Sequence, residues 1–166
     1  MSPSELLQIM YDSRLGTSLA ESLYIYPLVE GTHLLSLAFS FGLILVTDLR
    51  LIGVFLRQVP VDQLLHQLRP WLLGGFFVTF VTGILLTFAA GPELIESPIF
   101  PLKILLILLA GLNAIWFEYK FGRHIFYWSE QAIFPNGARV AGWISLTSWS
   151  GVVVLGRLIP YFDSGF

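Results

Sequence analysis

The chain has 166 residues, of which 55% are hydrophobic and only 12% charged, with a formal net charge of −2. A soluble domain carries about 25% charged residues, so this composition excludes a soluble globular domain, and the lack of basic excess argues against nucleic acid as a partner. The mean hydropathy of +0.76 predicts an all-α integral membrane protein that forms one domain, residues 1–166, in a lipid bilayer.

Four segments are long and apolar enough to cross the bilayer hydrocarbon as helices, which takes about 20 residues each. They cover residues 25–47, 71–90, 99–119 and 140–160. Pro70 is expected to open the second span. PSELLQIM (3–10) and PVDQLLHQLR (60–69) repeat apolar residues at helical spacing, which predicts short amphipathic helices. These would lie at the membrane interface or pack over the ends of an up-down four-helix bundle.

The basic residues predict the orientation of the bundle. Of the nine lysines and arginines, six lie in or beside the first and third loops, namely Arg50, Arg57, Arg69, Lys120, Arg123 and Arg139. Short cytoplasmic loops carry an excess of lysine and arginine. We therefore expect these loops in the cytoplasm and both termini in the periplasm, across a bacterial inner membrane.

A first layer of polar residues is expected in the outward half of the spans. Sequence position converts to depth at about 1.5 Å per residue, which brings Glu30, His33, Lys103 and Arg157 to similar depth. Charges in a bilayer need partners, so we predict that Glu30 pairs with Arg157. All four residues are candidates for binding a cofactor.

His33 suggests two kinds of cofactor. Glu30 and His33 share a helical face and could hold one metal ion, with Glu93 or Glu96 of the outward loop within reach. The Glu-x-x-His motif occurs once, which argues against a di-metal centre. A b-type haem with His33 as its axial ligand is the other possibility, with Lys103 and Arg157 meeting the propionates. The alternative without a cofactor is a buried histidine bonded to Glu30.

A second polar layer is expected at the cytoplasmic end, from Asp48, Arg50, Glu118 and Lys120. We predict structural ion pairs here, Arg50 with Glu118 and Asp48 with Lys120 or Arg69, and a binding or proton-handling role is the alternative.

Gly75, Thr79 and Gly83 recur at four-residue intervals in the second span. Such a row of small residues lets another helix approach closely. We expect it to pack within the bundle, with a homo-oligomer interface as the alternative.

Several stretches resemble a known family. They are Tyr26-Pro27 with Glu30 and His33, DLRLIG at 48–53, Gly111-Leu112-Asn113 with Phe117, and Gly156-Arg157. Together they resemble an uncharacterised bacterial four-span membrane family, similar in layout to the copper-resistance-D and cytochrome b561 group. The resemblance implies a four-helix membrane bundle. Family members commonly carry histidine after the phenylalanine of the third span, where this chain has Glu118.

These patterns leave three functions open. The first is a membrane protein that binds one redox cofactor near His33, a b-type haem or a metal ion, for electron transfer. The second is a small transporter or channel with Glu30 and Glu118 as stations, and the third is a non-catalytic subunit or assembly factor of a membrane complex. No nucleophile–base pair, phosphate loop or pair of catalytic carboxylates is present in the sequence, which argues against a hydrolase or transferase.

Overall fold

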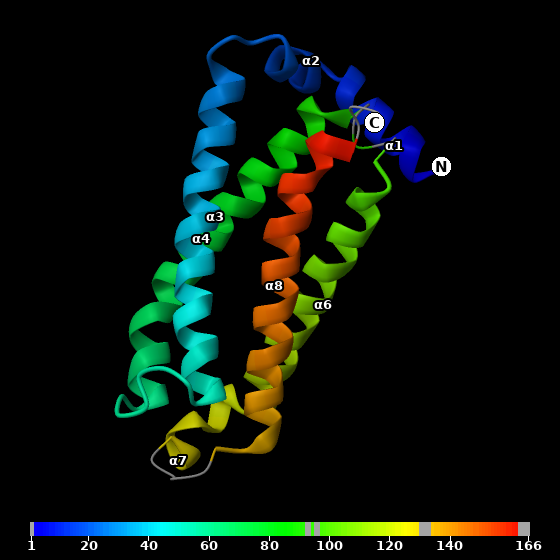
Figure 1. Ribbon diagram of the computed structural model, residues 1–166. Coiled ribbons are helices and arrows are strands. Elements are labelled where there is room, and N and C mark those ends of the chain that lie inside the picture. Colours follow the sequence, from blue (N-terminus) through cyan, green and yellow to red (C-terminus); the bar gives the residue numbers. More distant parts are fainter. Residues whose placement is uncertain (1, 92–93, 95–96, 130–133, 163–166) are drawn as a thin grey trace.

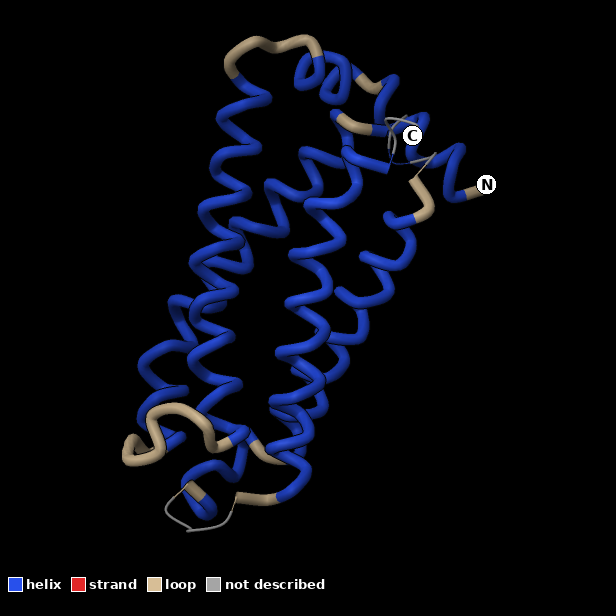
Figure 2. The backbone as a smooth tube through the Cα atoms, in the orientation of Figure 1, coloured by secondary structure: helices blue, strands red, loops and turns tan. Residues whose placement is uncertain are grey.

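The computed structural model describes residues 2–91, 94, 97–129 and 134–162, with the backbone alone for residues 160–162. Throughout this part of the chain the regular structure is helical (Figures 1 and 2). The elements are α1 (Pro3–Asp12), α2 (Arg14–Ala20), α3 (Ile25–Ile52), α4 (Val61–Ala89), α6 (Ile99–Lys120), the 3₁₀ helix η1 (Gly122–His124), α7 (Ile125–Trp128) and α8 (Asn136–Phe162).

Four of these helices, α3, α4, α6 and α8, are long and apolar enough to cross a membrane. α3 packs against α4 and α8, and α8 packs against α6. The helices alternate in direction, so both termini lie at one end, the terminal end, together with α1 and α2 (Figure 1). η1, α7 and the α3–α4 connection lie at the other end, the loop end (Figure 1). The predicted all-α four-helix bundle is confirmed, and the chain is a multi-pass membrane protein.

Helix boundaries follow the sequence closely where breakers act locally. α6 begins at residue 99 as predicted and ends one residue beyond 119. α3 runs to Ile52, five residues beyond the predicted 47, and Gly53 forms its C-cap. Gly53 has φ +89°, and its N–H donates to the carbonyls of Leu49 and Arg50. Glycine favours this left-handed position because it has no Cβ.

Pro70 does not open the second span. It lies inside α4, which continues from Val61 through the predicted amphipathic stretch into the span. Pro70 cannot donate a hydrogen bond to the carbonyl of His66, which is why the sequence suggested a break. The stretch is nevertheless anchored, because Val61 is buried and Leu65 packs beside it in a cluster at the loop end. The predicted separate short helix over residues 60–69 is therefore wrong, because the stretch forms the first part of α4.

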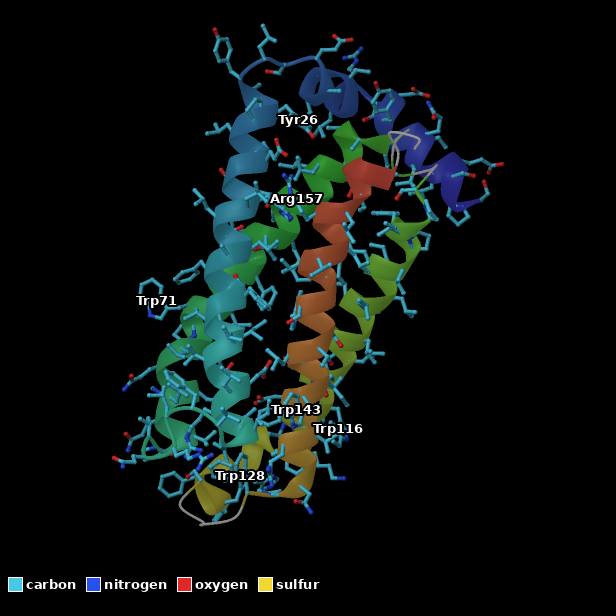
Figure 3. The ribbon with its side chains drawn as sticks, viewed as in Figure 1. Tyr26, Trp71, Trp116, Trp128, Trp143 and Arg157 are labelled. Carbon is cyan, nitrogen blue, oxygen red and sulfur yellow. The ribbon has the colours of Figure 1, made fainter. Side chains whose placement is uncertain are left out.

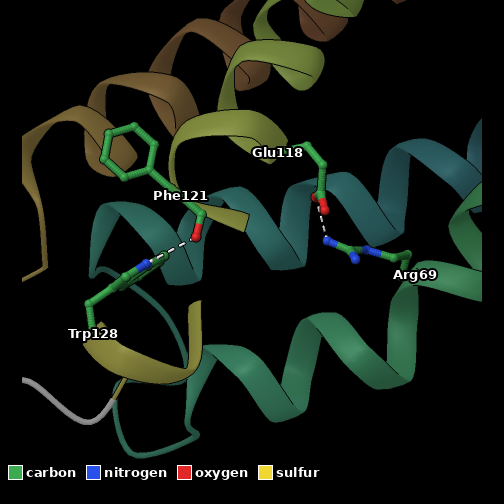
Figure 4. A network of polar contacts seen from close by, with 4 residues as sticks. All are labelled: Arg69, Glu118, Phe121 and Trp128. Carbon is green, nitrogen blue, oxygen red and sulfur yellow. Dashed lines mark hydrogen bonds and ion pairs between the residues drawn. The ribbon is translucent and has the colours of Figure 1, made fainter. Parts of the chain in front are cut away.

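That cluster at the loop end, which we call the loop-end cluster, is the main apolar core of the described residues. Its buried members are Leu51, Val61, Phe121, Trp128 and Ala138. They come from α3, α4, α7, α8 and the residue that follows α6. Trp128 donates from Nε1 to the Phe121 carbonyl at 3.1 Å (Figure 4). The cluster therefore joins all four spans through side chains and one buried hydrogen bond.

The terminal end is covered by α1 and α2. Ser2 caps α1 in a capping box with Glu5, and α1 buries none of its residues. Leu6 and Ile9 are exposed on α1, and a position of this helix at the membrane interface stays a prediction. Gly91 lies directly against Tyr11, so α1 and α2 fold back over the end of α4.

The predicted row of small residues on α4 faces α3. A Cβ added at Gly75 would collide with the Ser40 hydroxyl and come within 3.1 Å of Phe39 Cδ1. One added at Gly83 would lie 3.2 Å from His33 Cε1. The neighbouring Gly74 would meet nothing within 4 Å. The row therefore builds the α3–α4 contact inside one chain.

Candidate functional site

His33 lies on α3, half-buried, and bonds to α4 rather than to Glu30. Its Nδ1 is 3.1 Å from the Thr79 carbonyl and 2.9 Å from Thr82 Oγ1. The Thr82 hydroxyl has its own acceptors in the carbonyls of Val78 and Thr79. A carbonyl can only accept, so these partners assign the proton to Nδ1. In the neutral ring, Nε2 is then a bare acceptor.

The imidazole is held by a wider set of contacts between α3 and α4. Thr79 Oγ1 donates to Ser36 Oγ at 3.0 Å, and Ser36 Oγ donates to the His33 carbonyl at 3.0 Å. Gly83 supplies the space for the ring. Ser36 also lines an open, largely apolar groove of about 730 Å³ between the two helices. The orientation of His33 is therefore set by polar bonds to α4 and by the space that Gly83 leaves on the same helix.

Lys103 brings a positive charge to the same level. It lies on α6, partly buried, and interacts electrostatically with His33. Its ammonium nitrogen is 3.2 Å from where a Cβ on Gly156 of α8 would stand. Within the described part of the chain, no carboxylate lies within 4.0 Å of it. The Lys103 ammonium favours an acceptor or anionic group between the helices, whereas the bare Nε2 of His33 favours a hydrogen-bond donor or a metal.

Among the described residues, Glu30 is not a hydrogen-bond partner of His33. Glu30 is exposed on α3, and the hydrogen bonds of His33 run to α4 in its place. Arg157 lies towards the terminal end (Figure 3) and takes part in an interaction there. Its pairing with Glu30 stays a prediction.

The described residues hold no group of three histidines or carboxylates close enough to bind a metal ion. Glu93 and Glu96, considered as further ligands, lie outside the described residues.

The ion pair at the loop end joins Glu118 to a different partner from the one expected. Glu118 Oε2 is 2.6 Å from Arg69 Nη2 (Figure 4), whereas we predicted Arg50. Arg50 is buried, donates from Nε to the Val59 carbonyl at 2.7 Å, and places its guanidinium 4.6 Å from the centre of the Phe134 ring. Arg50 therefore closes the α3–α4 connection, and the ion pair sits on the surface.

Asp48 does not pair with the cations proposed for it. Lys120 lies over the rings of Trp116 and Phe121, at 5.6 and 5.9 Å, and Arg69 binds Glu118. The Asp48 carboxyl is 5% exposed and receives a hydrogen bond from Ser145 of α8. Its Oδ2 has no hydrogen-bond partner in the part of the chain that the structure describes. Asp48 is thus an interior carboxyl beside α8.

Sequence reasoning missed the residues that hold the two titratable groups, Thr82 for His33 and Ser145 for Asp48. Thr79 belonged to the predicted row of small residues, but its link to His33 was not anticipated. One signal was available: Ser36 and Ser40 follow His33 at helical spacing and mark the face of α3 that turns inward.

Comparisons with known proteins give the family. No curated protein and no solved structure matches the chain. A family model described as "Family of unknown function (DUF6644)" matches residues 19–162. That match covers all four spans and both polar layers, and nothing in it bears on the likeness to the copper-resistance-D and cytochrome b561 group. The chain belongs to this family of unknown function, DUF6644.

Proposed function

We propose that this membrane protein binds one b-type haem through Nε2 of His33 and takes part in electron transfer. The observation that carries the proposal is the double hydrogen bond of His33 Nδ1 to Thr79 and Thr82. Ligating histidines nearly always donate their other ring N–H to a carbonyl or carboxylate, which sets the tautomer and the ring orientation. His33 has this arrangement with Nε2 left for a ligand.

The donor set fits a haem with one histidine ligand. The chain has three histidines, and the other two, His66 and His124, are exposed and belong to the loop-end half of α4 and to η1. Lys103 and Arg157 are the cations that would meet propionates. Haem would supply one-electron chemistry when bound, while the chain's residues orient the ligand and exclude water.

A single metal ion held by His33 and Glu30 fits less well. Such sites usually take at least three protein ligands, and the described residues bring no third histidine or carboxylate to this pair. Glu30 is also exposed. We therefore favour haem over a metal ion.

The optical spectrum of protein purified from its own membrane tests this proposal. We expect a Soret band that is lost in His33→Ala and kept in His66→Ala, which removes a histidine from the loop-end half of α4. Wild-type protein that shows no Soret band, and no bound metal by mass spectrometry, would contradict the cofactor proposal. A band that survives in His33→Ala would move the ligand elsewhere.

We also propose a bacterial inner-membrane location with both termini in the periplasm. Arg57, Arg123 and Arg139 are exposed and belong to the loop-end segments, where the positive-inside tendency would hold them in the cytoplasm. A reporter enzyme that works only in the periplasm, fused to the C-terminus, should be active. Activity from a reporter that works only in the cytoplasm would reverse the orientation.

The geometry does not favour the channel with Glu30 and Glu118 as stations, because Glu30 is exposed and Glu118 forms a surface ion pair. A role as a non-catalytic subunit or homo-oligomer is tested by mild crosslinking in native membranes, where a lone species would count against it.

A further inference from the structure

Beyond His33, the inward face of α3 carries further polar residues. His33, Ser36, Ser40, Thr47 and Asp48 lie within about one third of the helix circumference, at 3.6 residues per turn, with Ser36 and Asp48 at the two edges of this face. From the first to the last they span about 22 Å at about 1.5 Å per residue. This is most of the roughly 30 Å of hydrocarbon in a bilayer.

The facing helices continue the series, and we call the whole set the polar seam. Thr79 and Thr82 of α4 stand beside His33 and Ser36. Ser145 of α8 bonds Asp48, and Ser148, one turn further along α8, is buried. Asn113 of α6 donates to the Ala141 carbonyl, one turn from Ser145, at 2.9 Å. Polar groups therefore line the interior from one end of the bundle to the other.

Polar side chains in membrane helices often serve only to hold helices together through hydrogen bonds. Several polar oxygens in this interior form no such bond. Among the described residues, Ser40 Oγ, Asp48 Oδ2 and Asn113 Oδ1 have no hydrogen-bond partner, and these residues are 0%, 5% and 8% exposed. Each buried polar group without a partner destabilises the fold. Residues selected only to join helices would have paired these oxygens across the interface.

The buried Asp48 carboxylate, in its ionised form, requires a compensating positive charge, and the neighbouring side chains do not supply one. In the described part of the chain no cationic side chain lies within 4.0 Å of its carboxyl, and the facing residues of α8 are Ser145 and Gly142. A metal cation would need several oxygen ligands, and no such group is present among the described residues. A proton needs only the carboxyl itself.

We propose that the polar seam conducts protons along the bundle, with Asp48 as the proton-carrying group. A proton reaches the Asp48 carboxylate and forms an O–H bond. It leaves when that bond breaks and a new O–H bond forms on a hydroxyl or a bridging water, without any electron transfer. Buried waters typically bind unsatisfied polar groups of this kind, and Ser148 stands between Asp48 and the level of Ser40. This proposal does not depend on haem binding.

Purified protein in liposomes tests the proposal. A potassium gradient with valinomycin sets the membrane potential, and an enclosed pH-sensitive dye reports proton entry. We expect wild-type flux above that of protein-free liposomes, and flux at the protein-free level for Asp48→Asn. Asp12→Asn, the same substitution on exposed α1, should leave the flux unchanged.

A second variant separates loss of function from loss of fold. Ser40→Ala removes an unpartnered hydroxyl with little change in volume and should also lower the flux, while gel filtration and circular dichroism stay like wild type. Wild-type flux no greater than that of empty liposomes would overturn the proposal. Unchanged flux in a folded Asp48→Asn variant would do so as well.

Discussion

The two ends of the bundle are built on different principles. At the loop end, Leu51, Val61, Phe121 and Trp128 form an apolar core that joins the spans. At the terminal end, the contact between α3 and α4 is made by His33, two threonines and a glycine. In most soluble proteins an apolar core would occupy both places.

The difference follows from the solvent at each level. The loop-end cluster lies where the spans end and water begins, so burying apolar side chains there gains the hydrophobic effect. Inside the hydrocarbon, lipid tails are as apolar as leucine, and facing inward gives leucine no such advantage. Small and polar residues, which allow close approach and hydrogen bonds, therefore occupy the interior of the spans. The long apolar side chains of α6, such as Leu105, Leu108 and Leu112, face outward.

Removing the largest side chain of the loop-end cluster should have the largest effect on stability. Trp128 is 6% exposed and makes edge-on contacts with Phe121 and Phe134. We expect Trp128→Ala to lower the free energy of unfolding by about 3–5 kcal/mol. Trp143→Ala, at a position 52% exposed, should cost far less. Denaturant titration in detergent compares the two, and equal losses would mean that this cluster is not the core.

Overfilling the α3–α4 contact should have the next largest effect. Gly75→Val would push against Ser40 and Phe39 and should cost about 1–3 kcal/mol of stability, as overpacking usually does. Gly74→Val adds the same atoms where nothing lies within 4 Å. If thermal unfolding shows no difference between the Gly75→Val and Gly74→Val variants, close packing at the row of small residues on α4 is not what holds α3 to α4.

A smaller effect is expected at the terminal end. Thr82→Val keeps the shape of the side chain but removes one of the two partners of His33 Nδ1, and the Thr79 carbonyl remains. We expect a loss of about 1 kcal/mol, the usual net value of one hydrogen bond. Thr32→Val is the control, because the Thr32 hydroxyl bonds only within its own helix, to Leu28. A loss as large as that of Trp128→Ala would erase the contrast between the two ends.

The surface ion pair should contribute least. Arg69 and Glu118 are close, but their side chains are 45% and 43% exposed. A double-mutant cycle with Arg69→Gln and Glu118→Gln should give a coupling energy of about 0.2–1 kcal/mol, as is usual for exposed pairs. Added salt should reduce it. A salt-independent coupling of several kcal/mol would show that the pair acts in a shielded environment.

The sequence by itself determined the number of spans, the limits of α6 to within one residue, the placement of both termini at one end, and the row of small residues on α4. These features depend on the apolar length of each segment and on local breakers, so each segment carries its own signal. The depth of a residue also follows, because the helical rise is constant. His33 and Lys103 were therefore expected at one level.

Only the tertiary structure decided which groups bond to one another. Depth leaves open how each helix is rotated about its axis and which neighbour it faces. His33 therefore bonds Thr82 where the sequence offered Glu30, and Glu118 binds Arg69 where it offered Arg50. Tertiary contacts also explain why Pro70 stays inside α4. Val61 is buried in a cluster whose members come from distant parts of the chain, and this burial offsets the effect of a local helix breaker. Such contacts join residues far apart in the sequence, and no single segment records them.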